Sequence, residues 1–159
     1  IAILSTINHL NNPFMKYFLY CLQHYADFNG RARRSEFWYF QLFKFLFIFL
    51  TMFIGLILSL VGGAFQEHST SGFLFVLSIL GALLISGSFV ASFGLLIPDL
   101  AVTARRLHDT GRSGWFQLLR YVPIVGGILL LVWYCTDSKP GENQYGPNPK
   151  GIGNDGNNW

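Results

Sequence analysis

The sequence predicts an all-α membrane protein: three transmembrane helices preceded by an amphipathic helix at the membrane surface. Hydrophobic residues make up 52% of the 159-residue chain and charged residues only 12%, about half the charged fraction usual in soluble domains. Three apolar runs, 42–61, 73–97 and 116–135, each reach the length of about 20 residues that a helix needs to cross a bilayer. A chain of this length is expected to form a single membrane domain over residues 15–150.

The ends of the chain are expected to lie outside this domain. Residues 1–14 lack a basic region followed by an uninterrupted apolar stretch, so they do not form a signal peptide. They precede the first methionine, Met15, and are interpreted as an upstream extension without fixed structure. Residues 151–159 are rich in glycine and asparagine, a composition typical of disordered segments.

The first element is predicted to be an amphipathic helix over residues 15–28. Its apolar residues recur at helical spacing on one stripe, and its charged residues lie off that stripe. The segment is too short and too polar to span a bilayer, so it suits the headgroup region. Packing against a protein partner is an alternative for the same stripe. The stripe consists of Tyr17, Phe18, Cys21, Leu22 and Tyr25.

The first span, 42–61, follows a sequence typical of a membrane-entry point. Three arginines come after a turn dipeptide and stand directly ahead of the aromatic run 37–40. Arginines remain with anionic headgroups, and Trp and Tyr side chains favour the interface. The turn is predicted at Asn29-Gly30, and the arginines are Arg31, Arg33 and Arg34.

The second span, 73–97, carries no charge and has small residues four positions apart. Small residues let helices approach closely in lipid, so the tightest helix contact is expected here. Pro98 follows and should kink the helix, because proline lacks an N–H and clashes with the preceding turn. We expect the helix to continue to about His108. The small residues fall on three lines: Ser78, Ala82 and Ser86; Gly87 and Ala91; Ser88 and Ser92.

The third span, 116–135, is interrupted by Arg120, Pro123 and a glycine pair. If it crosses fully, seven basic residues lie on one side of the membrane and two on the other. The positive-inside rule then places the N-terminus in the cytoplasm and the C-terminus outside. If it is re-entrant, the tail returns to the cytoplasm. The seven are Lys16, Arg31, Arg33, Arg34, Arg105, Arg106 and Arg112, and the two are Lys139 and Lys150.

The connector between the last two spans, residues 105–115, concentrates the polar chemistry of the chain. Adjacent helical residues point in different directions, so His108 and Asp109 cannot form a catalytic dyad. We interpret them as part of a turn, with Ser113 capping the next helix. The four histidines show no metal-ligand spacing, so no metal site or cofactor is predicted.

Charged side chains inside or beside the spans suggest two further features. Asp99 and Arg120 lie at similar distances from the connector on neighbouring antiparallel helices, so we predict that they pair within the membrane. The alternative is that Arg120 reaches the headgroups alone. Six arginines should converge on the cytoplasmic face, where their fork geometry matches phosphate. They are Arg31, Arg33, Arg34, Arg105, Arg106 and Arg112.

Four motifs resemble one family, the YhaH-like bacterial inner-membrane proteins known as domain of unknown function 805. The resemblance covers roughly residues 15–150 and implies a small multi-pass protein of the bacterial inner membrane. It implies no reaction, substrate or active-site residues. The motifs are FNGRARRSEFW at 28–38, RRLHDT at 105–110, SGW at 113–115 and PGENQYGP at 140–147.

The predicted function is that of a non-enzymatic structural or accessory membrane protein. Its expected partners are anionic lipids of the cytoplasmic leaflet, another membrane protein or further copies of the chain; the net charge of +3 is too small to indicate nucleic acid. One alternative is an oligomeric small-solute transporter or channel, lined by Ser86, Ser88 and Ser92 with Asp99 and Arg120. A second is a lipid-headgroup enzyme that uses His108 and Asp109.

Overall fold

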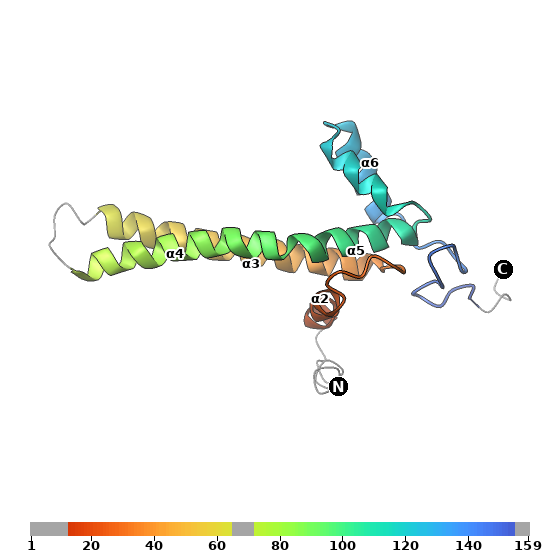
Figure 1. The fold of residues 1–159 in the computed structure, drawn as a ribbon, viewed down its shortest axis with the longest axis horizontal. Helices are drawn as coiled ribbons and strands as arrows, with labels where there is room; N and C mark the ends of the chain where they lie inside the picture. Colours follow the sequence, from red (N-terminus) through yellow and green to blue (C-terminus); the bar gives the residue numbers. More distant parts are fainter. Residues whose placement is uncertain (1–12, 65–71, 155–159) are drawn as a thin grey trace. The chain divides into compact units, whose positions relative to one another are not determined.

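The structure is a computed structural model, which describes residues 13–64 and 72–154. Over these residues every regular element is helical, which confirms the all-α class. The only strand-like pairing within them is one isolated bridge, between Asn143 and Gly146. In chain order (Figure 1) the elements are α2 (Pro13–Gln23), α3 (Arg34–Ala64), α4 (Gly72–Gly94), α5 (Leu96–Asp109), the 3-10 helix η1 (Gly114–Tyr121) and α6 (Val125–Cys135).

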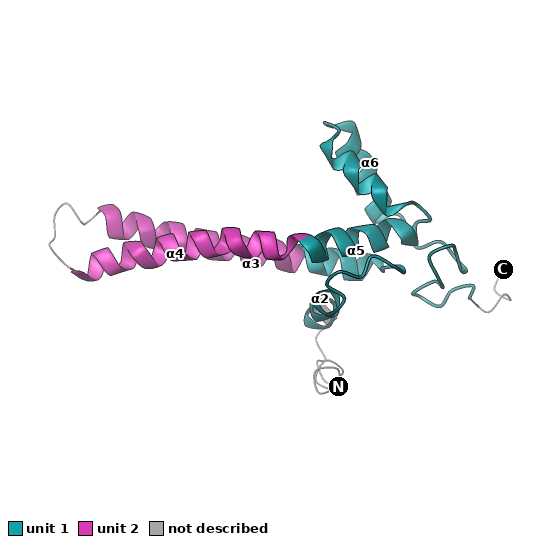
Figure 2. Cartoon of the chain, in the orientation of Figure 1, with its two compact units in different colours: residues 1–41, 97–159 teal, residues 42–96 magenta. Residues whose placement is uncertain are grey.

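The chain divides into two compact units (Figure 2). Unit 1 comprises residues 1–41 and 97–159, and unit 2 comprises residues 42–96. In unit 2, α4 lies alongside α3. Both helices are long and apolar enough to cross a membrane, and only 11% of the most apolar window of each is buried. So much exposed apolar surface is stable only against lipid or another apolar surface.

Small residues bring α3 and α4 together in unit 2. A Cβ added to Gly81 would lie 2.5 Å from the Gly55 carbonyl oxygen, and one added to Gly62 would lie 2.6 Å from the Ser78 nitrogen. The close contact in the second span is therefore real. Its buried residues are Ser88, which is on one of the predicted lines, and Gly81, which is on none of them. Ala82, Ser86 and Gly87, expected on the packed lines, are exposed instead.

The helix break expected from Pro98 comes before the proline, at Leu95. Pro98 has no N–H to donate to the Gly94 carbonyl, so the chain cannot continue α4 unbroken. It restarts at Leu96 as α5 and remains helical to Asp109.

The single third span predicted over residues 116–135 is not formed. In its place are η1, of eight residues, and α6, of eleven. Ile124, with φ 62° and ψ −67°, is the centre of a γ-turn closed by the Val125 N–H and the Pro123 carbonyl at 2.7 Å. At 1.5 Å per residue α6 reaches only about 16 Å, too short to cross a bilayer.

In unit 1, α2 packs on the start of α3 and on α5. Cys21, Phe37, Phe40 and Val102 form a buried cluster with Ala32. The predicted N-terminal helix is present, but it ends at Gln23 because the chain turns at residues 24–26. It begins at Pro13, within the expected extension; the rest of that extension, residues 1–12, lies outside the described residues.

The tail after α6 has turns and hydrogen bonds in place of helix. Residues 151–154, expected to be disordered, take part in it: the Asn154 side chain accepts from the Asn148 N–H at 2.7 Å. The Ile152 carbonyl accepts from the Gly141 N–H at 2.9 Å. These bonds hold the segment despite its polar composition, and the remaining residues 155–159 lie outside the described part.

Candidate functional site

The polar centre of unit 1 is the carboxylate of Asp109, at the end of α5. It is fully buried, and so are the two guanidinium groups that pair with it. Arg31 Nε lies 3.0 Å from Asp109 Oδ1, and Arg106 Nη1 pairs with Oδ2 from one turn back along the same helix. The Ser138 hydroxyl donates to Oδ2 as well. Both carboxylate oxygens are therefore used within the protein.

Arg31 directs its remaining donors at the tail. Its Nη1 donates to the Gly141 carbonyl at 2.8 Å, and its Nη2 donates to the Lys139 carbonyl at 2.6 Å. Arg31 follows Gly30, whose φ of +83° makes the tight turn that presents the arginine to Asp109. The Asn148 side chain donates to the same Lys139 carbonyl at 2.9 Å.

Arg106 is likewise surrounded by backbone carbonyls. It donates to the carbonyls of Tyr134 and Thr136, at the end of α6, and to the carbonyl of Ala32. Breaking a buried ion pair by removing one partner typically costs about 3–5 kcal/mol, because the remaining charge is left uncompensated. Asp109 with its two arginines is thus a structural centre that ties the start of α3, the end of α5 and the tail together.

The end of α5 explains why Asp109 faces inward. Gly111, with φ +76°, donates its N–H to the His108 carbonyl, and the Arg112 N–H donates to the Leu107 carbonyl. This pair of bonds is a Schellman motif, which ends the helix on a glycine. The predicted turn therefore comes after His108 and Asp109, which both belong to the last turn of α5.

The six predicted phosphate-binding arginines do not share one free surface. Arg31 and Arg106 are bound to Asp109. Arg33 Nε donates to the Pro149 carbonyl at 2.7 Å, and Arg34 pairs with Asp137 at 3.1 Å. Arg112 stacks over the Trp133 ring at 4.5 Å. These contacts use protein acceptors and rings where phosphate was expected.

Arg105 differs from the others because two of its buried nitrogens, Nε and Nη2, have no hydrogen-bond partner among the described residues. Its guanidinium carbon lies 5.8 Å from the centre of the Tyr20 ring. It also lies near Cys21, whose thiol has its pKa raised to about 12 by burial. Cys21 therefore remains protonated and unreactive at neutral pH.

The structure brings Asp99 and Arg120 together. Arg120 Nη1 lies 3.9 Å from Asp99 Oδ2, and the Gln41 side chain donates to Asp99 Oδ1 at 2.6 Å. The Asp99 side chain is 10% exposed and that of Arg120 is 36% exposed. The serines expected to line a pathway belong to unit 2, where the Ser88 hydroxyl donates to Thr51 Oγ1 at 2.8 Å.

His108 faces away from Asp109. Its ring stacks on the Tyr145 ring, with centroids 3.8 Å apart and planes 4° apart. Its Nδ1 lies 3.2 Å from the Gly30 carbonyl oxygen. Burial lowers the pKa of the imidazole, with the Gly30 contact acting against that shift. His108 is thus a neutral ring held by the turn before Arg31, and Asp109 does not orient it.

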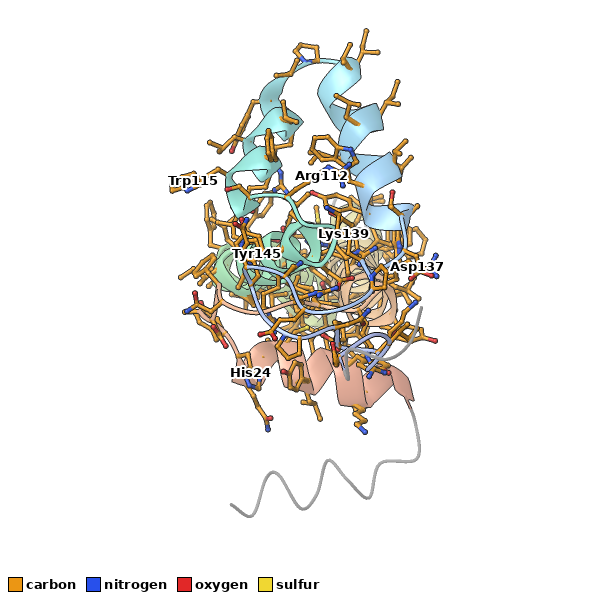
Figure 3. All side chains as sticks on the ribbon, turned by 90° about the vertical axis from the view of Figure 1, so that its right-hand side faces the viewer. His24, Arg112, Trp115, Asp137, Lys139 and Tyr145 are labelled. Carbon is orange, nitrogen blue, oxygen red and sulfur yellow. The ribbon has the colours of Figure 1, made fainter. Side chains whose placement is uncertain are left out.

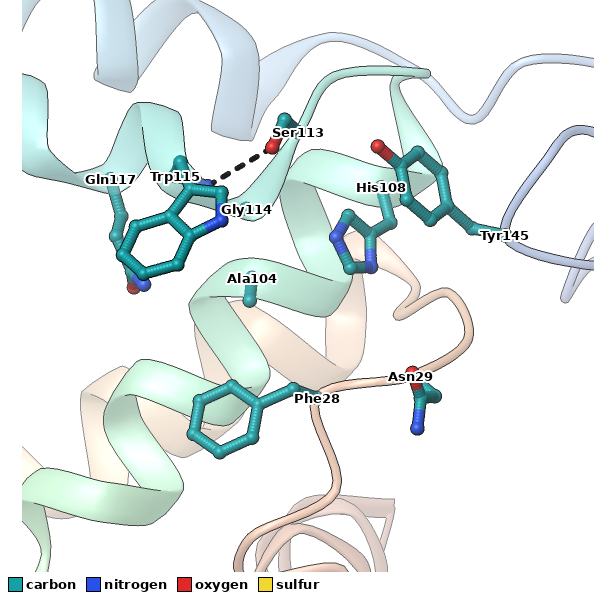
Figure 4. A pocket seen from close by; sticks show the side chains of 9 residues that line it. All are labelled: Phe28, Asn29, Ala104, His108, Ser113, Gly114, Trp115, Gln117 and Tyr145. Atoms are coloured by element: carbon teal, nitrogen blue, oxygen red, sulfur yellow. Dashed lines mark hydrogen bonds between the residues drawn. The ribbon is translucent and has the colours of Figure 1, made fainter.

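Beside His108 is a cavity of about 380 Å³ whose walls come from four segments of unit 1 (Figure 4). Gly114 is required there, because an added Cβ would lie 2.8 Å from Ala104 Cβ and 3.2 Å from His108 Nε2. Ser113 caps η1 by accepting the Trp115 N–H at 3.4 Å. The lining residues are Phe28, Asn29, Ala104, His108, Ser113, Gly114, Trp115, Gln117 and Tyr145.

The tail is the part of the site that sequence reasoning missed. It was assigned to the opposite side of the membrane, yet the Lys139 N–H donates to the Asp109 carbonyl at 3.1 Å. The Asn143 side chain donates to the His108 carbonyl at 2.9 Å. The signal was available in the PGENQYGP motif, whose turn residues predict a folded loop. Within the described residues, no group of three His, Cys, Asp or Glu side chains could hold a metal ion.

Two helices of membrane-spanning length and a polar unit closed by buried arginine–aspartate pairs define an all-helical membrane protein. The chain belongs to the DUF805 family: the model of that family, described as "Protein of unknown function (DUF805)", matches residues 25–147. All four motifs of the predicted resemblance lie within this range, and they supply Arg31, Arg106 and Asp109 and most of the residues that line the cavity.

Curated relatives agree with this membership. The chain is 38% identical over 138 residues to "Inner membrane protein YhaH" of Escherichia coli strain K12, covering 86% of this chain and 98% of the relative. It is 38% identical over 136 residues to "Inner membrane protein YhaI" of the same strain, covering 86% and 97%. Both relatives are inner-membrane proteins by name, and neither name indicates a reaction. No solved structure matches the chain.

Proposed function

We propose that this protein is a non-enzymatic accessory protein of the bacterial inner membrane, and that unit 1 binds anionic lipid headgroups at the cytoplasmic face. The observation that carries the proposal is the hydrogen bond between the Lys139 N–H and the Asp109 carbonyl. It ties the tail to the connector, which supports placing the basic residues of both on the same side of the membrane instead of dividing them seven against two.

The cations that remain exposed are the ones available to lipid. Lys44 is the one basic residue of unit 2, so all the other Lys and Arg side chains belong to unit 1. Lys16 and Lys139 are exposed and Arg112 is partly exposed, whereas Arg31 and Arg106 are neutralised by Asp109. Figure 3 shows Arg112 beside the base of the hairpin formed by η1 and α6, and Lys139 below it. Each basic residue near an anionic leaflet contributes about 1 kcal/mol to the binding of the protein to the membrane surface.

The η1–α6 hairpin supports a membrane-surface position for unit 1. Its turn is apolar and exposed: Tyr121 is 78% and Ile124 80% accessible. The hairpin is too short to cross, so we propose that it enters the bilayer from the cytoplasmic side and returns. Trp115, at its base, has the position that interfacial tryptophans favour.

The test is the lipid that remains on the protein. The full chain is purified from native membranes in mild detergent, and its bound lipids are weighed by native mass spectrometry. We expect anionic phospholipids to be enriched over their share of the membrane. Replacement of Lys16, Arg112 and Lys139 by glutamine should remove the enrichment. The control is Lys150→Gln, because Lys150 already pairs with Asp137. Equal lipid profiles for the triple variant and the control would refute the proposal.

A further inference from the structure

The cavity beside His108 is built for a small ligand group. Its volume of about 380 Å³ is at the lower end of ligand sites in proteins, which range over about 300–1,000 Å³. Figure 4 shows Trp115 and Phe28 on one side and His108 with Tyr145 on the other. These residues come from the turn before α3, the end of α5, η1 and the tail. The cavity exists only when those segments are assembled.

One hydrogen-bond acceptor, His108 Nε2, faces the cavity, and a second belongs to a residue of its wall. Gln117 Oε1 is buried without a partner among the described residues. Because His108 Nδ1 lies against a carbonyl oxygen, that nitrogen carries the proton. Nε2 is then an acceptor, and it faces the position of Gly114. A ligand that donates a hydrogen bond to Nε2 is therefore favoured.

The walls favour a cation over an anion. No Lys, Arg, Asp or Glu lines the cavity, so a phosphate would find no compensating charge there. The rings of Phe28, Trp115 and Tyr145 present aromatic surface, whose faces attract cations. An apolar group would leave His108 Nε2 without a donor. An ammonium group supplies both the positive charge and the N–H donors.

We propose that this cavity binds the ammonium group of an amphiphile that reaches it from the membrane surface. Trp115 and Phe28, which are 77% and 41% exposed, form its open rim. The inference rests on the proposed function for the position of unit 1 at the lipid surface. The ammonium group would bind at a different place from the anionic groups that are expected at the exposed cations. The neutral state of His108 accords with it, because a protonated imidazole would repel the ligand.

The test compares a lipid that carries an ammonium group with a derivative that lacks it. The full chain in detergent is titrated by native mass spectrometry with phosphatidylethanolamine and with its N-acetylated derivative, which lacks the ammonium. We expect the derivative to bind roughly ten-fold more weakly, the effect of losing a cation–π and a hydrogen-bond contact. His108→Phe, which keeps an aromatic ring against Tyr145 and removes the Nε2 acceptor, should weaken binding of phosphatidylethanolamine. Leu118→Ala, on the exposed part of η1 outside the cavity, should not.

Equal binding of the two lipids to the unaltered chain would overturn the inference without reference to any variant. Displacement of the lipid by free ethanolamine would assign the ammonium site to a soluble amine, and persistence of the lipid would assign it to a headgroup. Either result supports an ammonium site. The outcome is separable from that of the proposed function, because the lysine and arginine variant that should lose anionic lipid retains the whole cavity.

Discussion

At the scale of single residues, Asp109 has the largest structural role that the contacts reveal. One carboxylate accepts from two buried guanidiniums and a hydroxyl, and its backbone carbonyl accepts from the tail. The charge is compensated on every side, so the site binds segments of its own chain. The Asp109 carboxylate is therefore already saturated by groups of the protein itself.

Asp109→Asn keeps the shape of the side chain and removes its charge. We expect a loss of about 3–5 kcal/mol in stability, because Arg31 and Arg106 would remain buried without a counter-charge. The matched control is Asp137→Asn, at a 58% exposed side chain that pairs with Arg34 and Lys150. Such surface pairs contribute about 1 kcal/mol or less. Thermal unfolding in detergent, followed by circular dichroism, measures both, and similar melting temperatures for the two variants would contradict this account.

The sequence could suggest a pair of residues only where the distance of each from the connector along its helix was informative. Asp99 and Arg120 were expected together because each lies a similar number of residues from the connector, and the structure places their charged atoms 3.9 Å apart. The partner of Arg31 was not predicted, because Asp109 is 78 positions away in sequence. Periodicity relates neighbours within one helix and gives no register between distant segments.

At the scale of elements, composition predicted the first two spans well and the third poorly. Both membrane-length helices are apolar around their circumference, which a hydropathy window detects. The run 116–135 has the same composition, yet it folds as η1 and α6. The break depends on Pro123 and on Gly126, where an added Cβ would strike the Leu119 carbonyl. Both residues are visible in the sequence. They indicate that the helix is interrupted, but not whether the chain kinks or reverses its direction.

The sequence also did not identify which face of α4 packs against α3 in unit 2. Every face of that helix is apolar, so several lines of small residues were equivalent candidates. Contact with α3 selects Gly81 and Ser88, because their counterparts Gly55 and Thr51 lie opposite. Spacing on one helix cannot make this selection without the register of the other.

Gly81→Ala tests the packing of unit 2. The added methyl would lie within 2.6 Å of backbone atoms of Gly55 and Ser59, so the helices must separate. We expect a loss of about 1–3 kcal/mol. Gly87→Ala, on the same helix with nothing within 4 Å, is the control and should be neutral or slightly stabilising. Unfolding in a denaturing detergent compares them, and an unchanged Gly81→Ala variant would show that the helices are not in close contact.

At the scale of the whole molecule, the proposed re-entrant hairpin predicts on which side of the membrane the tail lies. Two crossings, by α3 and α4, would leave the N-terminal helix and the tail both in the cytoplasm. We expect a green fluorescent protein fused after Trp159 to fluoresce and an alkaline phosphatase fused there to be inactive. The same phosphatase inserted between α3 and α4 should be active. An active C-terminal phosphatase with a dark fluorescent fusion would restore a third crossing.

Arg31 binds acceptors in the tail, so these contacts cannot form until the tail has been synthesised. Its acceptor at Gly141 lies 110 residues further along the chain, so the guanidinium has no complete set of acceptors while the ribosome is still translating the spans. Contacts of such sequence separation form late, after local helices. Both spans can therefore enter the membrane before unit 1 closes. Emergence of the tail from the ribosome is then the event that allows unit 1 to close.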